Sequence, residues 1–386
     1  MPGDITMNKS EQLSYRIIED YGKGEISRKE AAIILGVTEK TIQRRAKAIR
    51  QSGMKGVKHG NCGKAPHNKI EETRKIEILK LVETKYFDFN LLHAREKIIE
   101  EGITCVSYGT FYQWCIKSGL GKGKRKRRPQ KARIIRERMA NEGLMLQMDG
   151  SYHDWNGKEK WCLIACIDDA TSNIPYAKFF KSETTEACLE VLKEIISIKG
   201  IPDIIYTDNA GWTGKGKREN FAQVKRACES LGIRIITTSS PQSKGRIERA
   251  WRTFQDRLIP ELRLAGIHTK INANQYLQQV FLPEYWNKRN TVEAINLVTR
   301  YRQVPDHIDL EQIFCCHYER IVTSDSCISY DGSRFKIKER KYGSLKGKSI
   351  TLHKHPGREV EAFWGHIQLT IEKLKPLKYN WLKKPA

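Results

Sequence analysis

The chain has 386 residues, more than one ordinary folding domain holds, so we expect it to divide into two to four domains. Its formal net charge of +24, from 69 Lys and Arg against 45 Asp and Glu, favours a polyanionic partner. A basic soluble enzyme or a ribosome-associated protein would share that charge. No segment approaches the ~20 consecutive apolar residues that span a bilayer, and the N-terminus lacks an apolar signal core. We therefore expect a cytoplasmic protein with no membrane partner.

The ten cysteines are scattered, without the regular spacing of a disulfide framework. We expect most of them to be small buried hydrophobic side chains. Cys162 and Cys166 lie four positions apart in a strand-like run, and Cys315 and Cys316 directly precede His317. Neither set has the C-x2-C spacing of a zinc site, so we expect no structural zinc.

Residues 1–60 predict a helix-turn-helix unit. Ser27 and Glu30 form a capping box that begins a helix, Gly36 ends it, and Thr38 can cap a second helix. A short helical hairpin without a ligand has the same pattern, but a basic outward face favours insertion into a DNA groove. The residues predicted to face DNA are Lys40, Gln43, Arg44 and Arg45.

Residues 61–120 predict a second helical unit that resembles a helix-turn-helix. Helices are indicated in IEETRKIEILKLVE, in NLLHAREKIIEEG and in SYGTFYQWCIKSG, where Ser107 is the capping residue. Phe111, Trp114 and Cys115 recur at helical spacing, so we expect them to face a core rather than to stack on bases.

Residues 121–140 read as a basic linker. Positions 121 to 138 hold ten Lys or Arg residues and one acid. Such a run repels itself when free and condenses along a phosphate backbone when bound, although a solvated tether would have the same composition. The linker residues predicted to contact DNA are Lys124, Arg125, Lys126, Arg127 and Arg128.

Residues 141–266 predict an α/β core. Apolar runs and helical periodicities alternate in the order β-β-β-α-β-α-β-α. Short turns favour antiparallel strands and helical crossovers favour parallel strands, so we expect a mixed five-stranded sheet with helices on both faces. Residues 267–302 read as a helical connector, and residues 303–386 as a small C-terminal β domain, barrel-like in form.

Three carboxylates fall where this order of elements would bring them together. Asp149 is expected to end the first strand, Asp208 to end the fourth, and Glu248 to lie in the first turns of the helix after the fifth. Singly, each reads as a solvated acid or, for Glu248, as an ion pair with Arg252. Together they predict a site for two Mg²⁺ or Mn²⁺ ions, because clustered carboxylates repel one another unless cations share them. Two metals about 3.5–4 Å apart are the arrangement for in-line attack on a phosphodiester.

The helix that carries Glu248 has a mixed surface. Its apolar stripe is predicted to bury Ile247, Trp251, Phe254 and Leu258, while an adjacent face carries Lys244, Glu248, Arg252 and Gln255. Lys244 and Arg252 are therefore further predicted DNA contacts.

Asp168 and Asp169 compete for the catalytic role, because they too follow a strand. We rank them lower, since Asp is a common turn residue at such positions.

The segments LMLQMDGSYHDW, CLIACIDDATS, IIYTDNA and SPQSKGRIERAW resemble the catalytic core of integrase-type DDE transposases, in particular the ISNCY group of bacterial insertion-sequence transposases. This resemblance implies a ribonuclease-H-like fold with the triad Asp149, Asp208 and Glu248. It also implies a nucleoid-associated bacterial enzyme that binds terminal inverted repeats, cleaves at the transposon boundary, and joins the freed 3′-hydroxyl to target DNA as a homo-oligomer in a synaptic complex.

Two other readings remain. A catalytically silent, transposase-derived regulator would keep the DNA-binding units, and a simple ribonuclease-H-type nuclease would keep only the core. The terminal repeat, the target preference and the choice between excision and copying are left open by the sequence.

Overall fold

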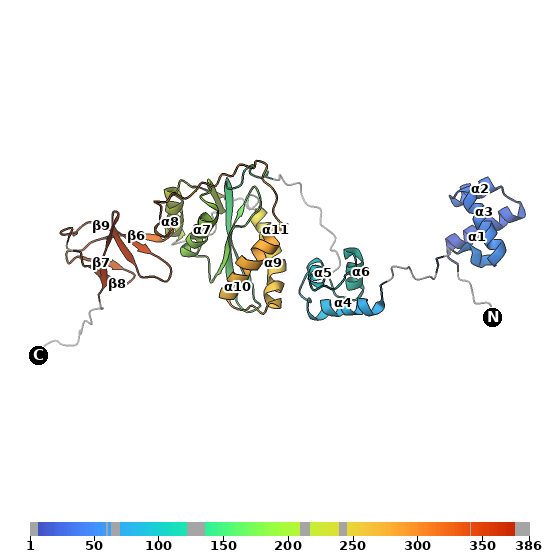
Figure 1. Ribbon diagram of the computed structural model, residues 1–386, viewed down its shortest axis with the longest axis horizontal. Helices are drawn as coiled ribbons and strands as arrows, with labels where there is room; N and C mark the ends of the chain where they lie inside the picture. Colours follow the sequence, from blue (N-terminus) through green and yellow to red (C-terminus); the bar gives the residue numbers. More distant parts are fainter. Residues whose placement is uncertain are drawn as a thin grey trace. The chain divides into compact units, whose positions relative to one another are not determined.

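A computed structural model of the chain (Figure 1) describes residues 7–58, 61–62, 70–121, 136–208, 217–238, 245–339 and 341–374. Internal contacts divide the chain into two compact units, Met1–Glu77 and Ile78–Ala386. Within the described ranges, no helix combines the length and apolarity that a membrane span requires.

The first unit contains helices α1 (Lys9–Lys23), α2 (Arg28–Leu35), α3 (Glu39–Ser52) and a 3₁₀ turn, η1 (Gly53–Val57). The predicted capping box of Ser27 and Glu30 is present, and Thr38 caps α3 as expected. Gly36 ends α2 with a φ of 61°, a left-handed conformation that costs glycine little. Ala31, Ala32 and Ile42 form the small core that holds α2 against α3.

Three further helices follow, α4 (Glu72–Thr84), α5 (Leu91–Glu100) and α6 (Tyr108–Lys117). Ser107 caps α6, as predicted, through a hydrogen bond from the backbone N–H of Thr110. Phe111 and Cys115 are fully buried, which confirms their core position, whereas Trp114 is only half-buried.

The central sheet has five strands, β1 (Met145–Asp154), β2 (Lys160–Asp168), β3 (Ala177–Phe180), β4 (Ile204–Asp208) and β5 (Arg234–Thr238). Their order is β3-β2-β1-β4-β5. The β1-β2-β3 pairings are antiparallel, and the β1-β4 and β4-β5 pairings are parallel. The predicted mixed sheet and the adjacency of the first and fourth strands are confirmed.

Helices cover both faces of this sheet (Figure 1). On one face lie α7 (Thr185–Lys199) and α8 (Lys217–Ser230), which bury Leu192, Ile195 and Val224 against the strands. On the other lie α9 (Gly245–Leu264), α10 (Lys270–Tyr276), the π-helical η3 (Leu277–Trp286) and α11 (Asn287–Arg289). This order of strands and helices is that of a ribonuclease-H-like core.

After the short helix α12 (Leu310–Ile313) come strands β6 (Cys316–Ile321), β7 (Cys327–Tyr330), β8 (Ser333–Ile337), β9 (Ser349–Lys354), β10 (Glu361–Trp364), β11 (Ile367–Leu369) and β12 (Ile371–Lys373). The expectation of a barrel-like domain needs correction, because the described strands form two sheets, β11-β10-β9-β6 and β12-β8-β7, and no closed barrel. Ile328, Ile350 and Leu352 are fully buried in the core that the two sheets share. Such short strands bury this core without completing a ring of hydrogen bonds.

Candidate active site

Strand β1 and helix α9 are joined by a ladder of polar contacts. Gln147, Asp149 and Ser151 alternate along β1, so their side chains share one face of the sheet. The matching residues of α9 are four positions apart and therefore lie on one side of the helix. The three contacts are Ile247 N to Gln147 Oε1 (3.4 Å), Trp251 Nε1 to Asp149 Oδ2 (2.9 Å) and Gln255 Nε2 to Ser151 Oγ (3.3 Å).

The strand register brings Asp149 and Asp208 to the same level. The last paired residues of the parallel strands β1 and β4 are Gln147 and Tyr206, and each aspartate lies two positions beyond its strand's paired residue. Asp208 is the final residue of β4, as predicted. The two aspartates therefore follow the paired segments of neighbouring parallel strands at an equal offset.

The expectation that Asp149 ends its strand was wrong. Strand β1 continues for five residues to Asp154, because its far half is still paired with β2 in a hairpin that closes at Asp154 and Lys160. Asp149 therefore lies inside a strand, where the backbone is held from the β2 side at Ala165.

Glu248 is the fourth residue of α9 and is half-buried. It precedes Trp251 by three positions, so it is a neighbour of the indole that donates to Asp149. The alternative of an ion pair with Arg252 is not found among the described residues, and Arg252 is exposed. The predicted apolar stripe is confirmed, because Ile247, Trp251, Phe254 and Leu258 are all buried.

Asp168 has the turn role predicted for it. Its carboxylate is fully buried and accepts hydrogen bonds from the backbone N–H groups of Gly143 and Thr171, both at 2.8 Å, and from the Thr171 hydroxyl. Burial raises the pKa of Asp168, and these hydrogen bonds oppose that rise. Asp168 therefore closes the turn after β2.

Asp169 has contacts beyond those of a turn residue. It is also fully buried, and it accepts hydrogen bonds from Gln147 Nε2 (2.6 Å), Arg246 Nη1 (2.8 Å) and the backbone N–H of Met139 (2.9 Å), as well as an ion pair from Arg136. It thus links the segment before β1, strand β1 and the start of α9. Asp169 supports the geometry of the site without being one of the predicted ligands.

Two features of this site, the Trp251 hydrogen bond and the partners of Asp169, could not be predicted from local sequence patterns. Trp251 reads there only as a member of an apolar stripe, although its indole N–H also donates to Asp149. The two arginine partners of Asp169 are 33 and 77 positions away along the chain, so no local spacing indicates them. Polar residues at every second position of β1 are the one pattern that points to a buried polar face.

The outward face predicted for the first unit is largely exposed. Lys40, Gln43 and Arg44 are exposed on α3, and Arg45 is half-buried. Ile42 and Ala46 are buried on the opposite side of the helix. The predicted contacts Lys124, Arg125, Lys126, Arg127, Arg128 and Lys244 lie outside the described residues.

Comparisons with known proteins give sequence relatives over most of the chain, while no protein-family model matches. The transposase of insertion sequence IS1202 from Streptococcus pneumoniae is 30% identical, covering 94% of this chain and 84% of that protein. The candidate transposase y4bF of Sinorhizobium fredii is 28% identical, covering 94% of this chain and 81% of its own length.

Among solved structures, the HTLV-2 integrase catalytic core domain in complex with magnesium is 21% identical with a TM-score of 0.30, and covers 38% of this chain and 89% of that one. The simian T-cell lymphotropic virus intasome is 15% identical with a TM-score of 0.32, over 77% and 95% of the two chains.

Proposed function

Because the chain belongs to the family of insertion-sequence transposases, we propose that it binds the terminal inverted repeats of its element and catalyses metal-dependent DNA strand cleavage and strand transfer. The observation that supports the catalytic part is that β1 and β4 are parallel neighbours whose last paired residues, Gln147 and Tyr206, each precede one of the two aspartates by two positions. The finer assignment to the ISNCY group, and the homo-oligomeric synaptic complex, belong to the same proposal.

The chain's own residues fit a hard divalent cation at this site. Asp149 is half-buried and is oriented by the Trp251 indole, and Asp208 ends the neighbouring strand. Together with Glu248 on α9, they would supply only carboxylate oxygens, which suit Mg²⁺ or Mn²⁺ rather than softer ions. Two bound ions would activate the attacking oxygen and stabilise the leaving oxygen of a phosphodiester. The protein's part is to hold three acids on rigid elements, with Asp169 and Gln147 anchoring the start of α9.

We place double-stranded DNA on the basic surfaces. The exposed side chains of α3 would read the terminal repeat, with Lys40 and Arg44 on phosphates and Gln43 on a base edge. Arg252, exposed one turn beyond Glu248, would hold a phosphate next to the scissile bond. The basic linker residues 124–128 and Lys244 would add sequence-independent contacts.

The test replaces each acid by its amide in the full chain. Asp149→Asn, Asp208→Asn and Glu248→Gln keep side-chain shape but remove charge, so each should reduce cleavage and strand transfer by orders of magnitude while DNA-end binding stays nearly unchanged. Cleavage of a labelled end duplex in Mg²⁺ or Mn²⁺ measures the first effect, and a mobility-shift titration measures the second.

The matched control is Asp154→Asn. Asp154 lies on the same strand, is exposed, and accepts a hydrogen bond from the backbone N–H of Gly157. Full activity in Asp149→Asn, or loss of activity in the control, would contradict the triad. A wild-type chain that binds its ends but cuts in neither metal would favour the silent regulator instead.

A further inference from the structure

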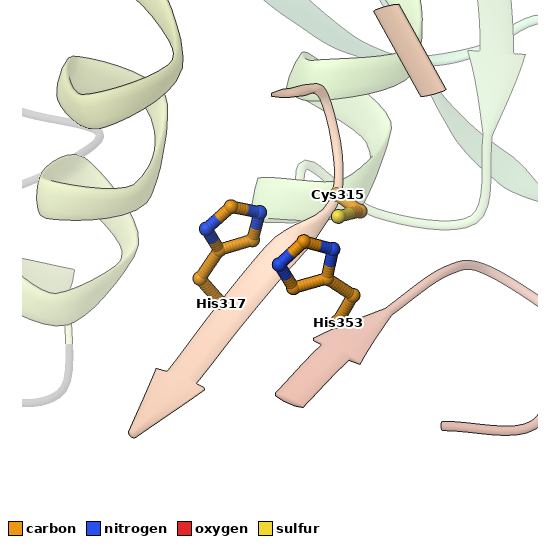
Figure 2. A group of neighbouring side chains, drawn as sticks. All are labelled: Cys315, His317 and His353. Atoms are coloured by element: carbon orange, nitrogen blue, oxygen red, sulfur yellow. The ribbon is translucent and has the colours of Figure 1, made fainter. Parts of the chain in front are cut away.

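Cys315, His317 and His353 form a second group of metal-ligand types, in the C-terminal β domain and away from the carboxylates. One ligand atom from each lies within 4.8 Å of the other two. Figure 2 shows the three side chains gathered at the start of β6 and on the neighbouring strand β9. Cys315 is 1% exposed and both histidines are half-buried, so the group is largely shielded from solvent.

The strand register explains the convergence. His317 and His353 are directly paired residues of antiparallel β6 and β9, so their side chains stand next to each other on one face. Cys315 precedes His317 by two positions and therefore falls on that face too. Cys316 alternates to the other face, where its sulfur contacts Glu186.

His355 extends the same pattern. It lies two positions beyond His353, and it is 4% exposed. Its Nε2 makes no hydrogen bond to the described residues, and its Nδ1 and Nε2 lie 4.0 and 3.9 Å from the carboxylates of Glu311 and Glu361. A Cys-x-His sequence at the start of β6 thus lies opposite a His-x-His sequence at the end of β9.

Gln312 forms hydrogen bonds with all three of these side chains. Its backbone carbonyl accepts hydrogen bonds from Cys315 Sγ (3.2 Å) and His317 Nε2 (2.9 Å), and its side-chain Oε1 accepts one from His353 Nδ1 (2.5 Å). A carbonyl that accepts from a ring N–H selects one tautomer and leaves a lone pair on the other ring nitrogen. Gln312 is therefore placed as the outer-shell partner that orients imidazole ligands in metalloproteins.

Binding one ion requires a rearrangement. The His317 and His353 rings are stacked at 3.9 Å with an interplanar angle of 6°, whereas a metal ion lies in the plane of each imidazole that binds it. Phe363 stacks on the other face of His353 at 4.3 Å, which holds that ring in place. His317 must accordingly turn, and His355, which lies outside the group of three and beside Glu361, must turn to join them.

We propose that Cys315, His317 and His353 bind a borderline-soft divalent ion of the Zn²⁺ class, with His355 as the fourth ligand. One thiolate and three imidazoles suit zinc and do not suit Mg²⁺, so this site would be distinct from the carboxylate site in both position and metal. Arg226 of α8 donates to the backbone carbonyls of Ile313 and Cys315 at 2.9 and 2.6 Å. The metal would therefore stabilise the junction between the ribonuclease-H-like core and the β domain.

The test uses Co²⁺ as a spectroscopic substitute for Zn²⁺ in the full-length chain. A thiolate bound to Co²⁺ has a sulfur-to-metal charge-transfer absorption that carboxylate ligands cannot produce. We expect this band to appear in the wild-type chain, to saturate at one ion per chain, and to be displaced by Zn²⁺. Zn²⁺ should also raise the melting temperature, because a ligand that binds only the folded state stabilises it. A wild-type chain without the band would overturn the proposal.

Variants assign the ligands. Cys315→Ser should abolish the band, while Cys316→Ser should keep it, because Cys316 is equally buried but faces the opposite side. His317→Gln should weaken Co²⁺ binding by more than the about 10–100-fold that loss of an outer-shell partner costs. His366→Gln, an exposed histidine between β10 and β11, is its control.

Two further variants test whether the Co²⁺ band comes from this site and whether His355 is one of the ligands. Asp149→Asn should leave the Co²⁺ band unchanged, since that acid belongs to the other site. A His355→Gln variant that binds Co²⁺ with unchanged affinity and spectrum would remove His355 from the ligand set and contradict the four-ligand form. Persistence of the band in a folded Cys315→Ser chain would contradict the site altogether. In that case the hydrogen bonds to Gln312 alone would explain why Cys315, His317 and His353 lie close together.

Discussion

Trp251 serves two purposes with one side chain. Its ring is buried in the core between α9 and the sheet, where it packs edge-on against Phe254 at 5.7 Å. Its indole N–H donates to the Asp149 carboxylate at 2.9 Å. A hydrogen-bond donor to a metal ligand orients that ligand, so Trp251 would position Asp149 in the proposed carboxylate site.

We predict that Trp251→Phe raises the Mg²⁺ concentration needed for half-maximal cleavage by about 10–100-fold, the usual effect of losing an outer-shell partner. The phenyl ring keeps most of the packing, so cleavage at saturating Mg²⁺ should recover towards the wild-type rate. The control is Phe254→Leu, which alters the same core without touching Asp149. An unchanged Mg²⁺ requirement in Trp251→Phe would show that the indole only fills space.

At the scale of elements, the two sides of α3 differ in burial. Ile42 and Ala46 are buried against α1 and α2, while Lys40, Gln43 and Arg44 are exposed. Because the exposed side chains carry little of the folding energy, they can be exchanged without unfolding the unit.

We expect Lys40→Ala and Arg44→Ala each to reduce the slope of log affinity against log salt by about 0.9 for every duplex, because each removes one cation that neutralises a phosphate. Gln43→Ala should instead leave that slope unchanged and lower the preference for the terminal repeat over scrambled DNA by about 1–3 kcal/mol. Fluorescence-anisotropy titrations of the full chain at several salt concentrations measure both quantities. The control is Lys23→Ala, which removes an exposed cation of α1 and should change neither the salt slope nor the preference for the terminal repeat. Equal effects of all four variants would contradict the proposal that α3 recognises DNA sequence.

Ion pairs connect α5 to α9 within the second unit. Glu261 of α9 accepts from His93 and Lys97 of α5, both at 2.8 Å, and Glu96 pairs with Arg257 at 2.6 Å. Burial would raise the pKa of Glu261, but the hydrogen bonds from His93 and Lys97 outweigh it and hold the pKa below its usual 4.5. In Glu96 burial likewise acts to raise the pKa, but the hydrogen bond and charge of Arg257 lower it below its usual value.

This arrangement predicts a stability loss in acid. A depressed folded-state pKa means that the contribution of Glu261 is present above pH 4.5 and disappears as the pH falls through the folded-state pKa. Urea unfolding of the wild type should therefore lose more free energy between about pH 5 and pH 3 than unfolding of Glu261→Gln, which has nothing to protonate. Glu229→Gln, on the exposed side of α8, should follow the wild type. Parallel curves for the wild type and Glu261→Gln would mean that Glu261 adds no pH-dependent stability.

At the scale of the whole molecule, charge is the dominant property. The excess of 24 positive charges is spread over several segments, of which residues 121 to 138 are the densest. A chain with this distribution should bind any duplex through its phosphates and should use the helical units to choose among sequences.

Neutralising Lys124, Arg125, Lys126, Arg127 and Arg128 together should weaken binding to terminal and scrambled duplexes alike. It should also flatten the salt slope by about 0.9 for each phosphate that is no longer neutralised. The control keeps the composition of residues 121–138 but shuffles their order, and it should bind like the wild type because phosphate attraction is blind to sequence. An unchanged slope in the neutralised chain would identify the segment as a spacer only.

Local patterns were sufficient to predict much of this protein from its sequence. The capping residues Ser27, Thr38 and Ser107, the order of strands and helices in the core, and the buried stripe of α9 were predicted correctly. Each depends on residues within a few positions of one another, and helical and strand periodicities are visible at that range. The charge of the linker is likewise a property of composition.

Tertiary structure alone decided what depends on pairing between distant segments. Strand β1 extends past Asp149 because β2 continues to pair with it, and Asp169 becomes a buried anchor because Arg136 and Arg246 reach it from other elements. His353 joins Cys315 and His317 through the register of β6 with β9, although 36 positions separate the two histidines. Strand register is set by hydrogen bonds between segments far apart in the sequence, so no local spacing reveals which side chains will meet across it.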